Sequence, residues 1–164
     1  MLRKLTAVCG LAVAAGLLTA GPRARAAVPA SCTAALTNDC LFTTLTDMGL
    51  SPRALSKGYL VTFKQDTWTI NVQFVLSPNL SRLGLNANLG MVEGSQVTAA
   101  QWQALMEANG DIDPTAFYYD ATQKKLYLHR TLENRYLTAA ILREQLDTFS
   151  ANMRSTAKLW AFTK

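Results

Sequence analysis

The chain has 164 residues, enough for one domain with one hydrophobic core. Its 16 basic and 11 acidic residues give a net charge of +5, but four basic residues (Arg3, Lys4, Arg23 and Arg25) lie within the first 26 positions. The remaining 138 residues carry 12 basic and 11 acidic side chains, without the clustered positive charge of a nucleic-acid-binding protein. The composition therefore argues against a nucleic-acid partner.

Residues 1–26 have the features of a secretory signal peptide. A positively charged start precedes an apolar run over residues 5–20, and the tripeptide Ala-Arg-Ala at 24–26 has the small-x-small form of a signal-peptidase site. The apolar run is shorter than the about 20 residues of a membrane-spanning helix. We therefore expect cleavage before Ala27, export to the periplasm or the exterior, and no stable membrane anchor afterwards.

Two cysteines, Cys32 and Cys40, remain after this cleavage, in a compartment that permits disulfides. In one continuous helix their Cα atoms would lie about 12 Å apart, which is too far for a disulfide. A bridge therefore requires the first helix to begin near Thr37 or Asn38. The alternative is two free thiols, with Cys40 packed as a small apolar residue.

A short lead at residues 27–36 is expected to precede a single α+β domain at residues 37–164. Favourable first residues of a helix at 37–39 are followed by apolar residues at helical spacing, Leu41, Leu45 and Met48. Gly49 and the proline that follows it at position 52 end this helix.

Alternation with a period of two then predicts three strands, over residues 59–63, 68–76 and 83–89. The central strand has the clearest pattern, because its apolar residues alternate with Thr69, Asn71 and Gln73. The three strands are expected to form an antiparallel meander with one apolar and one polar face.

The second helix is expected to begin at Thr98, because Gln101 three residues later completes a capping box. The predicted buried stripe of this helix is Trp102, Leu105 and Met106. A β-hairpin follows, with strands over residues 116–119 and 126–130.

The last helix is predicted to be the longest. Its apolar residues recur at helical spacing: Leu142, Leu146, Phe149, Met153, Ala157 and Trp160. Separate runs of strands and helices indicate an α+β fold, with the order helix, three-stranded meander, helix, β-hairpin and long C-terminal helix packed on one sheet.

This order of elements resembles the type III secretion chaperone-like fold, shared by secretion chaperones of the CesT type and by the YbjN family. The resemblance spans roughly Leu41 to Phe162. It is strongest from Gln103 to Trp160, a segment made of Leu105-Met106-Glu107-Ala108-Asn109-Gly110, Phe117-Tyr118-Tyr119-Asp120, Lys125-Leu126-Tyr127-Leu128 and the long helix that ends in Trp160. The resemblance implies a binding fold that is often dimeric, with the C-terminal helix covering the sheet and no catalytic residues to carry over.

Residues typical of catalysis or metal binding do not form a recognisable motif. Acidic residues between 109 and 120 match part of a calcium-loop register, but Pro114 stands where such a loop needs glycine. The single histidine, His129, has no nucleophile or orienting partner at a recognisable spacing. Zinc-ligand spacing and a glycine-rich phosphate loop are also absent from the sequence. We therefore predict a protein that is not an enzyme and needs no metal or cofactor. The alternative is an enzyme assembled from distant residues, with a cleft that collects His129 and two or more acidic residues.

The second hairpin carries the candidate partner-binding residues Tyr118, Tyr127 and His129. The two tyrosines could face each other across the hairpin, and aromatic residues are enriched at binding hot spots. The alternative is that the tyrosines only stabilise the sheet and that His129 is a rim residue.

We therefore predict an exported, non-catalytic module that is chaperone-like or regulatory. It is expected to bind a protein partner or a second copy of itself through sheet-edge or hairpin residues. In a monomer, charged residues of the hairpin could protect that edge instead: Lys124, Lys125 and Arg130. The alternative function is a small-ligand carrier or sensor in the cell envelope, with its ligand held between sheet and helix.

Overall fold

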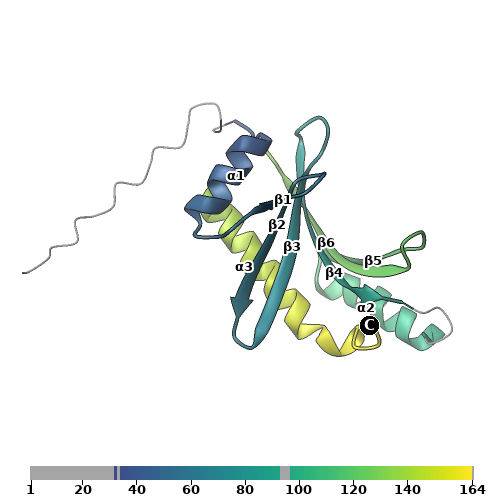
Figure 1. Ribbon diagram of the computed structural model, residues 1–164. Helices are drawn as coiled ribbons and strands as arrows, with labels where there is room; N and C mark the ends of the chain where they lie inside the picture. The colour runs from purple at the N-terminus through teal and green to yellow at the C-terminus, as the bar shows by residue number, and fades with distance from the viewer. Residues whose placement is uncertain (1–31, 33, 93–96, 164) are drawn as a thin grey trace, which may run out of the picture.

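The computed structural model describes residue 32, residues 34–92 and residues 97–163 (Figure 1). The predicted signal peptide at residues 1–26 and residues 27–31 of the lead lie outside this part. Within it, no helix is long and apolar enough to cross a membrane.

The described residues form three α-helices and six strands in the predicted order, with one short strand added. The helices are α1 (Asn38–Asp47), α2 (Ala99–Asp111) and α3 (Ala139–Ser155). The strands are β1 (Arg53–Ala54), β2 (Tyr59–Gln65), β3 (Trp68–Leu76), β4 (Arg82–Met91), β5 (Thr115–Asp120) and β6 (Lys125–Glu133). The two-residue strand β1 has no signal in the sequence, because it is too short to show alternation.

All six strands belong to one antiparallel sheet in the order β1-β2-β3-β4-β6-β5. The predicted meander is confirmed as β2–β3–β4, and the predicted hairpin is β5–β6. The pairing of β4 with β6 joins these two units, and the sheet twists strongly from one edge to the other (Figure 1).

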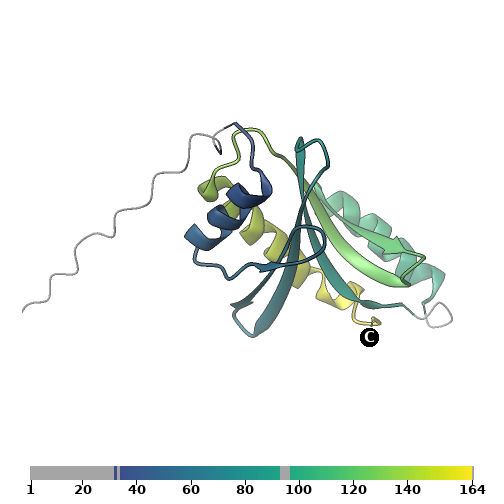
Figure 2. The ribbon, with the colours of Figure 1, turned by 45° about the horizontal axis from the view of Figure 1, so that its top comes forward.

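The three helices cover one face of the sheet. Figure 2 shows α1 and α3 side by side over one half of the sheet and α2 next to β5. Strand residues on this face are buried at alternate positions: Val61, Ile70, Val72, Phe74, Leu83, Leu85, Ala87, Leu126 and Leu128. They belong to the same core as the buried apolar residues of α3, which are Leu142, Leu146, Phe149 and Met153. The predicted α+β architecture is therefore confirmed.

The last helix is shorter than predicted, because α3 ends at Ser155 and residues 157–159 form a 3₁₀ turn. The Thr156 N–H still donates to the carbonyl oxygen of Asn152, but the Leu159 N–H donates to the carbonyl oxygen of Thr156 over 2.8 Å, which is the three-residue spacing of a 3₁₀ turn. The prediction that the helix continues to Trp160 is therefore wrong. Trp160 nevertheless packs edge-on against Trp68, with the ring centroids 5.9 Å apart.

A disulfide joins Cys32 to Cys40, whose Cα atoms lie 5.6 Å apart. The chain between them is not one helix, because α1 begins only after Thr37, whose hydroxyl accepts a hydrogen bond from the Cys40 N–H. The first helix therefore begins at Asn38, as the disulfide requires.

The lead packs onto the domain through Leu36 and the fully buried Asn134, which is 98 positions away in the chain. The Asn134 carboxamide accepts from the Leu36 N–H over 3.1 Å and donates to the carbonyl oxygens of Leu36 (2.9 Å) and Leu80 (2.8 Å). One side chain thus joins the lead to the turn between β3 and β4.

We predict that Phe149→Ala lowers the free energy of unfolding by about 3–5 kcal/mol, because Phe149 is fully buried and its loss leaves a cavity. The matched control is Ile141→Ala on the same helix. Ile141 is 42 % exposed, so its loss should cost less than about 1 kcal/mol. Urea unfolding of both variants measures the difference, and equal costs would contradict the assignment of the buried face of α3.

Candidate functional site

The sheet face opposite the helices, called here the open face, carries mainly polar side chains and a group of aromatic rings. Its residues include Thr62, Thr69, Asn71, Gln73, Gly84, Asn86, Tyr118, Tyr127, His129 and Thr131. Polar pairs cross between its strands, as where the Thr62 hydroxyl donates to the Asn71 carboxamide oxygen over 2.6 Å. The predicted polar face is therefore accessible to a binding partner.

The structure brings the three candidate partner-binding residues together on the open face. Tyr118 lies directly opposite Tyr127 in the β5–β6 pair, and their rings stack with centroids 5.0 Å apart and planes 10° apart. The His129 ring meets Tyr118 edge-on, 5.9 Å between centroids. Burial is the largest cause that raises the pKa of both tyrosines, so both remain neutral phenols at neutral pH. Their role in binding stays a prediction.

His129 connects β4 and β6 through a short chain of hydrogen bonds. Its Nδ1 lies 2.7 Å from the Asn86 carboxamide oxygen, and its Nε2 lies 2.7 Å from the Thr131 hydroxyl. Because a carboxamide oxygen only accepts, Nδ1 carries the proton and Nε2 accepts from Thr131. Burial lowers the pKa of His129, which favours this neutral form.

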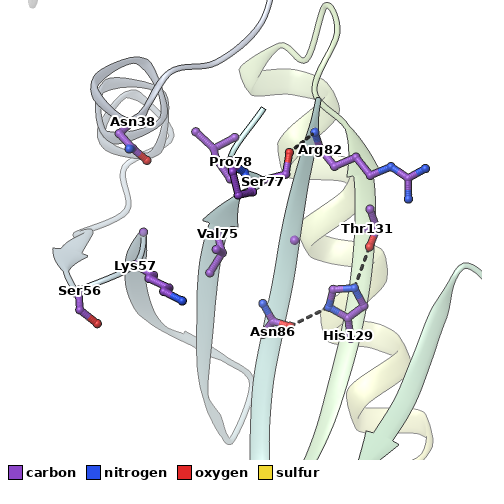
Figure 3. A pocket seen from close by; sticks show the side chains of 13 residues that line it. Asn38, Ser56, Lys57, Val75, Ser77, Pro78, Arg82, Asn86, His129 and Thr131 are labelled. Carbon is purple, nitrogen blue, oxygen red and sulfur yellow. Dashed lines mark hydrogen bonds between the residues drawn. The ribbon is translucent and has the colours of Figure 1, made fainter. Parts of the chain in front are cut away.

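Beside this chain of hydrogen bonds lies a cavity of about 650 Å³, called here the open-face cavity (Figure 3). Its lining residues come from β3, β4, β6, the turn between β3 and β4, the start of α1 and the turn before β2: Asn38, Ser56, Lys57, Gly58, Val75, Leu76, Ser77, Pro78, Arg82, Gly84, Asn86, His129 and Thr131. The lining contains no Asp or Glu, so this cavity does not combine His129 with the acidic residues of an acid–base site. The cavity lies on the open face, whereas the carrier hypothesis placed its ligand between sheet and helix.

A second, apolar concavity of about 250 Å³ lies between α2 and β5, and we call it the α2–β5 groove. It is lined by Trp102, Leu105, Met106, Phe117, Tyr118, Tyr119 and Leu126. The sequence predicted that Met106 is buried, and this is wrong, because its side chain is 69 % exposed. Leu105 and Ala108 face the sheet, and the helical turn carries Met106 away from it.

The β5 edge next to this groove is partly closed by Asn109 at the end of α2. The Asn109 carboxamide accepts from the Phe117 N–H over 2.6 Å and donates to the Phe117 carbonyl oxygen over 3.3 Å. These are the two backbone groups that an added strand would use at Phe117. The same two bonds give Asn109 a structural role.

Arg130 was expected at the hairpin edge, and this expectation is wrong. It is 7 % exposed and lies on the helix side of the sheet. Its guanidinium donates to the Thr115 hydroxyl over 3.2 Å and to the side-chain oxygen of Gln145 on α3. Alternation along β6 already places Arg130 with Leu126 and Leu128, but its charge favoured an exposed assignment.

Among the described residues, no group of three or more His, Cys, Asp or Glu side chains is arranged to hold a metal ion. No protein-family model and no curated protein matches the chain.

Several solved structures share the fold at low sequence identity. The ExsC–ExsE complex matches with a TM-score of 0.54 and 20% identity, over 75% of this chain and 92% of that one. YbjN from E. coli matches with a TM-score of 0.56 and 15% identity, over 72% and 86% of the two chains. The HopA1–SchA chaperone–effector complex matches with a TM-score of 0.50 and 14% identity, over 70% and 88%. The type III secretion chaperone-like fold that the order of elements predicts is therefore confirmed.

We predict that Asn109→Ala accelerates amide hydrogen exchange at Phe117 by at least about tenfold, because the N–H loses its acceptor. The control is Gln103→Ala, an exposed residue of the same helix whose side chain donates to the Glu107 carboxylate. The Leu85 amide in the centre of the sheet should not respond in either variant. Unchanged exchange at Phe117 would show that Asn109 does not protect this edge.

Proposed function

We propose that this chain is an exported, non-catalytic, chaperone-like module that binds another protein at the α2–β5 groove. The observation that carries the proposal is the exposure of large apolar side chains around this groove. Met106 is 69 % exposed, and Tyr118 and Tyr119 are 43 % and 38 % exposed. Trp, Tyr and Met are enriched in interfaces, and buried aromatic anchors dominate their energetics.

The partner would bind mainly through side chains at this edge. Because Asn109 already occupies the Phe117 N–H and carbonyl oxygen, strand addition there would have to displace it first. The groove itself is pre-formed, since the Trp102 and Tyr119 rings meet edge-on with centroids 5.4 Å apart. An apolar side chain of a partner can enter it without paying for a large rearrangement.

The solved structures support this function at the level of the fold. The ExsC–ExsE and HopA1–SchA structures are complexes, the second of a chaperone with an effector. These complexes and the apolar α2–β5 groove together support the proposal that this chain binds a protein partner or a second copy of itself.

Export is the second part of the proposal. The charged start, apolar run and Ala-Arg-Ala site of residues 1–26 support it. The Cys32–Cys40 disulfide also supports it, because disulfides persist in oxidising compartments.

A small-ligand carrier in the cell envelope is the second candidate function. The open-face cavity favours it, because about 650 Å³ falls within the range of small-molecule sites.

Photo-crosslinking tests the protein-binding function. A photoreactive phenylalanine analogue at Met106, in the full chain expressed in its native cell, should give one discrete protein adduct. The matched control places the analogue at Glu107, an exposed neighbour outside the groove. An adduct of twice the chain mass would identify a homodimer. Absence of an adduct from position 106, or equal labelling from position 107, would contradict the proposed surface.

The export prediction has a separate readout. The mature protein should begin at Ala27 and should show no reactive thiol until a reductant is added. Replacing both cysteines by serine should then lower the free energy of unfolding by about 2–3 kcal/mol, as expected for a short closed loop. Recovery of the chain from the cytoplasm with its first 26 residues intact would contradict export.

A further inference from the structure

We propose that the open-face cavity binds a small organic carboxylate with a short apolar body. The inference is independent of protein binding at the α2–β5 groove, and it gives a ligand class to the carrier function. It rests on the rigid wall that carries Lys57, on the oriented amide of Asn86, and on the absence of acidic residues from the cavity lining.

The wall of the cavity is the turn at residues 55–58, which is held firmly against β3. A Cβ atom on Gly58 would lie 1.9 Å from the Phe74 carbonyl oxygen, so only glycine permits this close approach. The Gln73 side chain donates to the Lys57 carbonyl oxygen over 2.9 Å, and the Leu55 N–H donates to the Gly58 carbonyl oxygen over 3.0 Å. The turn therefore positions the Lys57 backbone before any ligand arrives.

Lys57 supplies positive charge without an internal partner. Its exposed side chain points from the turn toward the strand that carries Val75 (Figure 3), and it forms no ion pair with any described residue. Glu133, which lies opposite Arg82 in the β4–β6 pair, is bound to Arg135 over 3.8 Å and does not line the cavity. The charge balance in the cavity therefore favours an anion.

Asn86 supplies a hydrogen-bond donor that faces the same space. Because its oxygen accepts from His129 Nδ1, its NH₂ group is directed toward Gly84, where a Cβ atom would lie 3.5 Å from Nδ2. The bond from Thr131 to His129 Nε2 holds the imidazole in the orientation that this requires. An NH₂ group held in place in this way can donate to a carboxylate oxygen.

The rest of the cavity suits a short apolar body. Val75 contributes an apolar side chain near Lys57, and Pro78 contributes another beside Ser77 (Figure 3). Gly84, which has no side chain, also lines the cavity. Side chains of this kind line small-molecule sites around a few placed polar groups. Together they select a carboxylate that carries a hydrocarbon segment over a compact, fully polar anion.

Titration of the mature protein with sodium hexanoate, followed by amide NMR, tests the proposal. The Gly84 amide and the Asn86 side-chain NH₂ should shift and saturate. The neutral analogue 1-hexanol should bind at least about fivefold more weakly, because it lacks the charge that Lys57 attracts.

Two variants locate the site. Gly84→Val adds a side chain to the cavity lining, where its Cβ atom would make ordinary contacts at 3.4–3.6 Å, and saturable binding should be lost in a variant whose thermal unfolding curve shows that it folds. Lys57→Gln should weaken hexanoate binding about fivefold and leave 1-hexanol binding unchanged. The control Lys158→Gln removes an exposed cation outside the cavity and should have no effect.

Three results would overturn the proposal. One is the absence of saturable shifts at Gly84 and Asn86. The others are equal binding of hexanoate and 1-hexanol, and an unchanged affinity in a folded Gly84→Val protein. None of them would affect crosslinking from Met106, so failure of this site and failure of the protein-binding function can be distinguished.

Discussion

Burial on one side of the sheet is the constraint on which the rest of this structure depends. Side chains at alternate positions of the strands point to a single face, and all three helices cover that face. The apolar surface removed from water there is the main driving force for folding. Because no helix in the described chain covers the opposite face, its residues are free to be polar and to bind other molecules.

Carboxamide side chains complete this arrangement where regular backbone pairing ends. Asn134 joins the lead to the β3–β4 turn, Asn109 closes part of the β5 edge, and Asn152 of α3 donates to the Ile112 carbonyl oxygen. Each supplies a bond that a neighbouring strand or turn would otherwise make, since buried backbone groups need a partner. The same side-chain chemistry, in Asn86, turns toward the open-face cavity.

The periodic parts of the fold could be predicted from the sequence because period and burial are directly linked. Alternation from Trp68 to Leu76 and the stripe from Leu142 to Met153 identified β3 and α3. The end of α3 was misjudged because the apolar spacing continues to Trp160, although beyond Thr156 the backbone forms a 3₁₀ turn. Met106 was misjudged because the α2 stripe that faces the sheet is narrower than the run of apolar residues.

The candidate sites could be predicted only in part. Tyr118, Tyr127 and His129 share one face of a hairpin, so their proximity follows from local register. The open-face cavity forms because the order of strands in the sheet places the turn at Lys57 near β3, β4 and β6. Local sequence spacing does not reveal this order of strands. The α2–β5 groove could not be predicted either, because its shape depends on how α2 packs against β5.

Solvent accessibility measured by NMR with a soluble gadolinium chelate tests the one-sided burial most directly. Side-chain protons of the exposed open-face residues Thr62, Thr69 and Asn71 should show strong paramagnetic relaxation. The methyl groups of Val72, Leu85 and Leu128, which are buried, should be shielded. Strong relaxation of those methyl groups, or shielding of the open face in the isolated mature protein, would contradict the account.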